Sequence, residues 1–309
     1  MKKTFWLLGI LICIALVVIG IGVKVYLRNP ALVEVGSLPS SSKNDPMVVD
    51  GHGFTKRTFT DALGRSITYY FYVPKNYNPH QKYPLVLLLH GHGERSSTSY
   101  SEAKNENNIV GQTFVQVWGP DYTAPFNPQV QQHWPSFIVV PQLTNKQQWA
   151  NRPSNKGSYT QTAQPSLQLL LAKELVDALQ HDYSGIDAQR LYITGLSLGG
   201  YGTWDAIERW PNYFAAAAPI AGAGDPSKAA QLIHLPIWAF HGSADKSVPV
   251  SGSRDMIKAI KAAGGHPNYT EFPNATHSVW WRVYSATGTS QHVNGFYNWL
   301  YTQKNHNSS

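Results

Sequence analysis

The sequence predicts one α/β domain with a mostly parallel central sheet and helices on both faces. Short continuous apolar runs recur along the chain, and several are separated by stretches with apolar residues at three- and four-residue spacing. Such runs are typical of strands buried on both faces, and strand–helix alternation is typical of parallel sheets. With 42% hydrophobic and 14% charged residues, the composition is that of a folded globular chain.

The predicted elements follow from these patterns in chain order. Apolar, aromatic or β-branched runs predict strands at 66–73, 85–89, 137–140, 191–194, 214–220, 236–240 and 268–272. Helical spacing predicts helices at 166–181, 198–209 and 253–263, and a C-terminal helix is expected at 295–301. We assign residues 51–304 to this domain. Ligands bind at the carboxyl ends of parallel strands, so chemistry should be sought in the residues that follow each run.

Residues 1–28 are predicted to form a signal anchor or a signal peptide. The stretch from Phe5 to Val23 is uncharged and mostly apolar behind two lysines, long enough to cross a hydrocarbon layer about 30 Å thick. No clear small-x-small cleavage site precedes Arg28, which favours an uncleaved helix. We expect a membrane anchor with the domain on the extracytoplasmic side, or a secreted or periplasmic protein if the segment is cleaved. Residues 29–50 are expected to be a flexible linker.

The composition argues against a nucleic-acid partner and against cysteine chemistry. The formal net charge is +7, but four of the positive charges lie in the first 28 residues, and the rest of the chain has no run of Lys or Arg. Phosphate recognition requires a concentrated basic patch. The single cysteine, Cys13, lies inside the apolar segment, so neither an intrachain disulfide nor a cysteine-based metal site is available.

A sharp strand-to-helix turn is predicted at residues 195–200. Its sequence is Gly-Leu-Ser-Leu-Gly-Gly, directly after the strand at 191–194 and directly before a helix. In this setting the G-x-S-x-G pattern strains the serine backbone, and side chains at the flanking glycines would collide with the strand and the helix. Ser197 is therefore the candidate nucleophile. The Leu198 amide at the helix N-terminus is a candidate oxyanion donor.

A serine hydroxyl needs a base to act as a nucleophile near neutral pH, usually a histidine held by a carboxylate. Asp245 follows the strand at 236–240, and His277 follows the strand at 268–272. Serine, then acid, then histidine is the chain order expected for a nucleophile on such a turn. We predict that His277 is the base and that Asp245 orients it, with Asp225 as the alternative acid.

The strand at 85–89 is followed by the loop His90-Gly91-His92-Gly93. Glycines let the backbone of such a loop approach a substrate oxygen, so the His92 amide is predicted to be the second oxyanion donor. A metal site on His90 and His92 is the competing interpretation. No third ligand with suitable spacing is evident, and we predict no metal.

Four stretches together resemble the α/β-hydrolase superfamily. They are LLLHGHGER at 87–95, Pro141-Gln142 followed by Trp149, YITGLSLGGYGTW at 192–204, and FHGSADKSVPV at 240–250. Within the superfamily the chain is similar to bacterial esterases of the feruloyl-esterase-like group, related to phospholipase/carboxylesterases and often labelled predicted peptidases. The similarity runs from about Phe59 to Leu300.

The resemblance implies an α/β-hydrolase fold and hydrolysis of carboxylic esters through an acyl-enzyme intermediate on Ser197, without a metal or organic cofactor. The expected substrate is a small-molecule or polysaccharide-linked ester. A serine peptidase of the same fold is the alternative, and a non-catalytic binding protein on this fold is a second one. The motifs do not fix acyl or alcohol specificity.

The connection from Glu94 to Pro135 is longer than a simple crossover between strands requires. Loops of this length are usually functional or mobile. We expect it to form part of the wall of the substrate pocket, with Trp118, Trp204 and Trp280 as candidate substrate-binding residues.

Overall fold

The computed structural model describes residues 53–95, 128–152, 157–285 and 293–305. The predicted anchor or signal peptide, the predicted linker and Trp118 lie outside the described residues. Across these four ranges, no helix combines the length and the apolar character needed to span a membrane.

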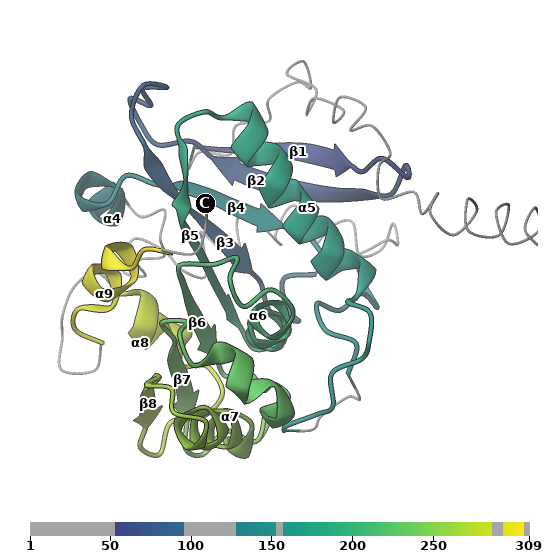
Figure 1. Ribbon diagram of the computed structural model, residues 1–309, viewed down its shortest axis with the longest axis vertical. Coiled ribbons are helices and arrows are strands. Elements are labelled where there is room, and N and C mark those ends of the chain that lie inside the picture. The colour runs from purple at the N-terminus through teal and green to yellow at the C-terminus, as the bar shows by residue number, and fades with distance from the viewer. Residues whose placement is uncertain (1–52, 96–127, 153–156, 286–292, 306–309) are drawn as a thin grey trace, which may run out of the picture. The chain divides into compact units, whose positions relative to one another are not determined.

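Eight strands of the described chain form one sheet, in the order β1-β2-β4-β3-β5-β6-β7-β8 (Figure 1). They are β1 (Phe54–Thr60), β2 (Ser66–Tyr72), β3 (Tyr83–Leu89), β4 (Phe137–Pro141), β5 (Ile186–Leu196), β6 (Ala216–Ile220), β7 (Trp238–Gly242) and β8 (Asn268–Phe272). Strand β2 is antiparallel to both of its neighbours, β1 and β4, and all the other pairings are parallel. The predicted α/β class with a mostly parallel sheet is confirmed.

Each face of the sheet has its own apolar core because successive side chains of a strand point to opposite faces. In β3, Leu85, Leu87 and Leu89 belong to one core, whereas Val86 and Leu88 belong to the other. The two groups of helices that cover these cores lie on opposite sides of the sheet (Figure 1). The first group is α5 (Leu167–Asp182), α6 (Leu198–Arg209), the 3-10 helix η2 (Pro226–Leu232) and α7 (Ser251–Ala262), and the second is α4 (Pro128–His133), α8 (Trp280–Tyr284) and α9 (Phe296–Thr302).

The structure adds elements that the sequence patterns did not predict, namely β1, α4, η2 and α8. Strand β1 carries Lys56 and Arg57 among its threonines and forms the edge of the sheet, so it lacks the apolar run of a central strand. Helices α4 and α8 have six and five residues, too few for a 3.6-residue period to be recognised. Strand β5 begins at Ile186 rather than at Leu191, with a polar first half.

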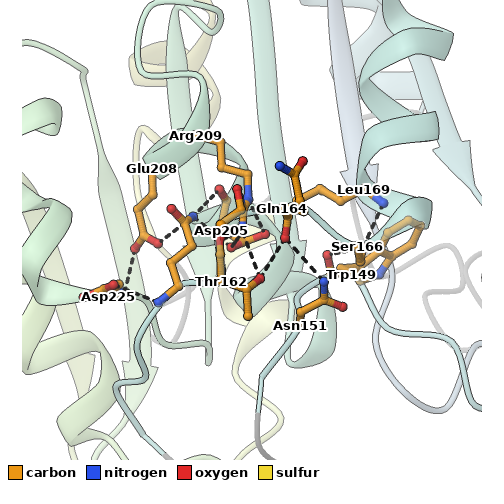
Figure 2. Close-up of polar contacts among 12 residues, drawn as sticks. Trp149, Asn151, Thr162, Gln164, Ser166, Leu169, Asp205, Glu208, Arg209 and Asp225 are labelled. Carbon is orange, nitrogen blue, oxygen red and sulfur yellow. Dashed lines mark hydrogen bonds and ion pairs between the residues drawn. The ribbon is translucent and has the colours of Figure 1, made fainter.

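Residues 157–166, which we call the strap, cross α6 and are held by the buried carboxylate of Asp205 (Figure 2). This carboxylate accepts hydrogen bonds from the Gln161 Nε2 at 2.8 Å and from the Tyr159 hydroxyl at 3.3 Å. Its second oxygen accepts from the Arg209 Nε at 3.0 Å. The strap is thereby tied to the helix that begins at the predicted nucleophile.

Glu208 is a second buried carboxyl group beneath the strap (Figure 2). Its Oε1 accepts the Asp225 amide at 2.8 Å, and its Oε2 accepts Gln161 Nε2 at 3.3 Å. Burial raises the pKa of Glu208 well above its usual range, because a charge is poorly solvated in the protein interior. The folded protein therefore keeps this carboxyl group protonated at pH values where the unfolded chain ionises it.

We predict that Glu208→Gln changes the pH dependence of stability. A group whose pKa is raised on folding contributes stability below its unfolded pKa and loses it as pH rises. Between about pH 5 and pH 7 the free energy of unfolding of the wild type should fall relative to Glu208→Gln by up to about 1.4 kcal/mol per pH unit.

Urea unfolding of both proteins at several pH values measures this difference. The control is Glu271→Gln, because hydrogen bonds from Arg254 lower the pKa of Glu271, so that this variant should show no such trend above about pH 5. Parallel pH profiles for the wild type and Glu208→Gln would contradict the prediction.

Candidate active site

Ser197 lies on a strained turn between β5 and α6. Its backbone has φ 53° and ψ −113°, a conformation that non-glycine residues rarely adopt and that is concentrated at functional sites. The Ser197 amide donates to the Ile220 carbonyl oxygen at 2.9 Å, and its carbonyl oxygen accepts from the Tyr201 amide at 3.1 Å. These bonds on both sides hold the strained residue in place.

The glycines of the motif are required by close backbone packing. A Cβ atom on Gly199 would overlap the carbonyl oxygen of Leu89 at the end of β3. A Cβ atom on Gly195 would lie 2.5 Å from the carbonyl oxygen of Gly199, closer than real Cβ contacts. The sequence prediction of a tight turn at this point is therefore consistent with the structure.

Ser197, His277 and Asp245 form a continuous chain of hydrogen bonds. His277 Nε2 lies 2.8 Å from Ser197 Oγ, and His277 Nδ1 lies 2.7 Å from Asp245 Oδ2. Because an ionised carboxylate only accepts, Nδ1 carries the hydrogen, and in the neutral ring Nε2 is left to accept the proton of the serine hydroxyl. The structure thus brings together the three side chains predicted as nucleophile, base and orienting acid.

The Asp245 carboxylate is completely buried. Its Oδ1 accepts the amides of Ser247 and Val248 at 2.8 and 2.9 Å. Burial alone would raise the pKa of Asp245, but hydrogen bonds from His241, His277 and the Val248 amide outweigh that effect and hold it well below its usual range. The group therefore stays ionised and can stabilise an imidazolium ion on His277.

The loops that carry the acid and the base are hydrogen-bonded to one another. The Asn274 amide donates to Ser243 Oγ at 2.8 Å, and the Ala244 amide donates to the Ala275 carbonyl oxygen at 2.9 Å. A Cβ atom on Gly242 would overlap the carbonyl oxygens of the facing loop. Asp245 and His277 are thus held in register by their own backbones.

The alternative acid, Asp225, does not contact the base. Its Oδ1 accepts the Ser227 amide at 3.0 Å at the start of η2, and its Oδ2 accepts the Gln161 amide at 2.8 Å. Asp225 therefore holds the strap, and the structure favours Asp245 as the orienting acid.

The loop carrying His92 lies against the serine turn. A Cβ atom on Gly91 would lie 2.7 Å from the Leu196 side chain. Leu198 is the first residue of α6, where backbone amides have no intrahelical acceptor. The Ser197 hydroxyl at the N-cap position makes no capping bond to the first turn. The two predicted oxyanion donors, on His92 and Leu198, are thus on neighbouring segments at the carboxyl end of the sheet.

His90 is fully buried and uses both ring nitrogens in the fold. Nδ1 donates to the Gly91 carbonyl oxygen at 2.7 Å, and Nε2 accepts the Leu143 amide at 3.0 Å. The exposed His92 ring instead contacts the Arg95 guanidinium. His90 therefore has no nitrogen left for a metal, and the described residues hold no group of three His, Cys, Asp or Glu side chains placed to bind one.

The predicted substrate-binding tryptophans have different locations. Trp280 is partly exposed, and its ring lies edge-on to His277 with 5.4 Å between the ring centroids. The prediction for Trp204 is wrong, because this side chain is fully buried in the core between α6 and the sheet.

Two contributors to the site were not assigned a role from sequence. Trp149 is fully buried, and its Nε1 donates to the His90 carbonyl oxygen at 3.0 Å, which fixes the loop carrying His92. His241 lies beside Asp245. The signal for His241 was available, because it directly follows the strand predicted at 236–240 and precedes Asp245 by four residues.

Comparison with known proteins shows that the chain is similar to esterases. The family model described as "Putative esterase" matches residues 60–299. A solved thermostable esterase is 34% identical with a TM-score of 0.65, covering 82% of this chain and 63% of that one. The bifunctional acetylxylan esterase/xylanase of Neocallimastix patriciarum is 26% identical over 228 residues, 71% of this chain and 28% of its own length.

A solved acylaminoacyl peptidase of Pyrococcus horikoshii is 14% identical with a TM-score of 0.51, and covers 73% of this chain and 38% of that one. At this identity the similarity shows the fold alone. The chain spans less than two thirds of the length of each of these three proteins.

We predict that His90 makes stability sensitive to acid. Burial lowers the pKa of His90 from 6.5 to about 4, so the unfolded chain takes up a proton below about pH 6.5 that the folded chain resists until near pH 4. Relative to His90→Gln, the wild type should lose about 3 kcal/mol of unfolding free energy between pH 7 and pH 4.

Urea unfolding of both proteins at three pH values across this window tests the point. A difference between wild type and variant that stays constant with pH would show that His90 does not resist protonation.

Proposed function

The chain belongs to the esterase family whose model spans residues 60–299, and from this premise we propose that it hydrolyses carboxylic esters by serine catalysis. One observation carries the proposal: the side chains of Ser197, His277 and Asp245 are linked by hydrogen bonds, and Ser197 lies on a strained turn. The esterase relatives support the reaction class, and the geometry supports the roles of the three side chains.

In the proposed reaction, Ser197 Oγ attacks the ester carbonyl carbon while His277 Nε2 takes the hydroxyl proton. The Asp245 carboxylate stabilises the resulting imidazolium ion, and the amides of Leu198 and His92 donate to the tetrahedral oxyanion. His277 then gives its proton to the departing alcohol oxygen as the carbon–oxygen bond breaks. The acyl group remains on Ser197.

Deacylation repeats these steps with water as the nucleophile. His277 takes a proton from the water as its oxygen attacks the acyl carbon, and it returns the proton to Ser197 Oγ as the carboxylic acid leaves. All the proton transfers use the chain's own side chains, and no step in the proposal draws on a metal or an organic cofactor.

For the substrate, we propose a small-molecule or polysaccharide-linked ester. The acetylxylan esterase named among the relatives supports an acyl group carried on a polysaccharide. The partly exposed Trp280 ring beside His277 offers an apolar surface next to the reacting atoms, suited to an aromatic acyl group or to the face of a sugar ring.

The test of the proposed reaction is the hydrolysis of p-nitrophenyl acetate by the wild type and by Ser197→Ala. Loss of the nucleophile should lower kcat by at least about 10⁴-fold. Only the weak hydrolysis that substrate binding and the oxyanion donors support should remain. Ser278→Ala is the matched control, because Ser278 is exposed next to His277 and should leave the rate unchanged.

Comparing acetylated xylan, methyl ferulate and a peptide p-nitroanilide resolves the substrate class and the peptidase alternative. Retention of esterase activity in Ser197→Ala would remove Ser197 as nucleophile. Preference for the peptide amide over every ester would favour the peptidase, and no turnover of any of them would favour a binding protein.

We also propose, from the sequence alone, that the N-terminal apolar segment anchors the domain to a membrane on its extracytoplasmic side or directs its export. Fractionation of cells expressing the full chain should place the protein in the membrane pellet at full mass if the segment is retained, or in the periplasmic or secreted fraction at reduced mass if it is cleaved. A variant that lacks residues 1–28 is the control, and it should no longer be found in the membrane pellet. A full-mass protein in the soluble cytoplasmic fraction would contradict the prediction.

A further inference from the structure

A second histidine lies against the acid of the proposed triad. His241, in β7, has a completely buried side chain. Its Nε2 lies 3.0 Å from the Val248 carbonyl oxygen, to which it donates, and 3.2 Å from Asp245 Oδ2. The same carboxylate oxygen accepts the Nδ1 proton of His277, so two imidazole rings flank a single oxygen atom of Asp245.

The hydrogen on His241 Nε2 follows from its neighbours. The Val248 carbonyl oxygen and the ionised Asp245 can only accept, so Nε2 must carry a hydrogen. On the other side of the ring, Nδ1 lies 2.8 Å from Ser253 Oγ, which lies 3.2 Å from the Gly222 carbonyl oxygen. The Ser253 hydroxyl can donate either to the imidazole or to that carbonyl, so the ring keeps its Nε2 hydrogen in either case.

Val248 gives His241 a second connection to the same carboxylate. The Val248 amide donates to Asp245 Oδ1 at 2.9 Å, while its carbonyl oxygen accepts from His241 Nε2 at 3.0 Å. The ring therefore fixes the loop that holds one carboxylate oxygen and directly contacts the other. A side chain that lost these contacts would leave both the loop and the carboxylate less firmly held.

We propose that His241 is a positioning residue that holds Asp245 ionised and aimed at His277, extending the proposed triad inward by one member. This inference depends on the proposed function, because His241 would act only through Asp245. His241 itself is buried and contacts neither Ser197 Oγ nor His277 in the hydrogen bonds of the described residues.

Two substitutions separate this role from simple packing. In His241→Gln the side-chain amide reaches the position of the Nε2 atom. In His241→Asn the shorter side chain reaches only the position of the Nδ1 atom, so it keeps the contact with Ser253 and loses the contacts made by Nε2. We expect His241→Asn to lower kcat for p-nitrophenyl acetate by about 10- to 100-fold, the usual range for a group that orients a functional ligand. His241→Gln should keep kcat within about fivefold, and neither should change KM by more than about twofold.

A double-mutant cycle with Asp245→Ala shows whether the effect passes through the acid. In the Asp245→Ala background, His241→Asn should change kcat by less than about threefold, because the group it positions is gone. Tyr192→Phe is the control for loss of a buried hydrogen bond far from the triad, since the Tyr192 hydroxyl donates to the Gln303 carbonyl oxygen at 2.8 Å. It should lower the melting temperature and leave kcat unchanged.

The outcomes distinguish this inference from the proposed function. If Asp245→Ala keeps wild-type kcat, the triad itself is wrong. If Asp245→Ala loses activity while His241→Asn loses none, or loses the same factor in both backgrounds, His241 does not act through Asp245 and the inference is overturned. Equal losses in His241→Asn and His241→Gln would also overturn it, because only one of them lacks the donor at Nε2.

Discussion

The site depends on a backbone contact between α6 and the end of β3. Gly199 lies so close to the Leu89 carbonyl oxygen that no side chain fits between them. This contact places the first turn of the helix beside the loop that follows β3, and therefore places the serine and both predicted oxyanion donors together. The strain on Ser197 persists because the surrounding sheet and helix fix the residues on either side of it.

The two histidines buried near the site have opposite electrostatic settings. His90 bonds to backbone groups and to the Gln142 amide, and burial outweighs the bond to the Gly91 carbonyl oxygen and lowers its pKa to about 4. His241 faces a carboxylate. The neutral His90 ring adds no charge to the loop that carries the predicted oxyanion donor. The His241 ring directs an N–H group toward the buried carboxylate of Asp245.

The sequence was informative wherever a local pattern reflects burial or backbone strain. The continuous apolar run of β3 and the glycines around Ser197 predicted a buried strand and a sharp turn, and both are present. Asp245 and His277 followed from chain order and from their places after predicted strands. The location of Trp204 could not be predicted in this way. A tryptophan on the helix that follows a nucleophile faces the core or the pocket depending on how the helix is rotated about its axis.

Other features depend on contacts between distant segments and leave little trace in the sequence. The bond from Trp149 to the His90 carbonyl oxygen joins positions 59 residues apart. The role of Asp225 in holding the strap is set by the Gln161 amide, 64 residues away. Helix α8 is too short to show a period, although it begins with Trp280 beside the base.

The hydrogen-bonded pair of loops after β7 and β8 constrains how this architecture can diverge during evolution. Because Ala244 and Ala275 share a backbone bond and Gly242 leaves no space beneath the facing loop, an insertion in either loop would shift the register of the other. A change in the length of one loop should therefore be accompanied by a change in the length of the other. Novel specificities would arise more readily in segments that lie outside this paired unit.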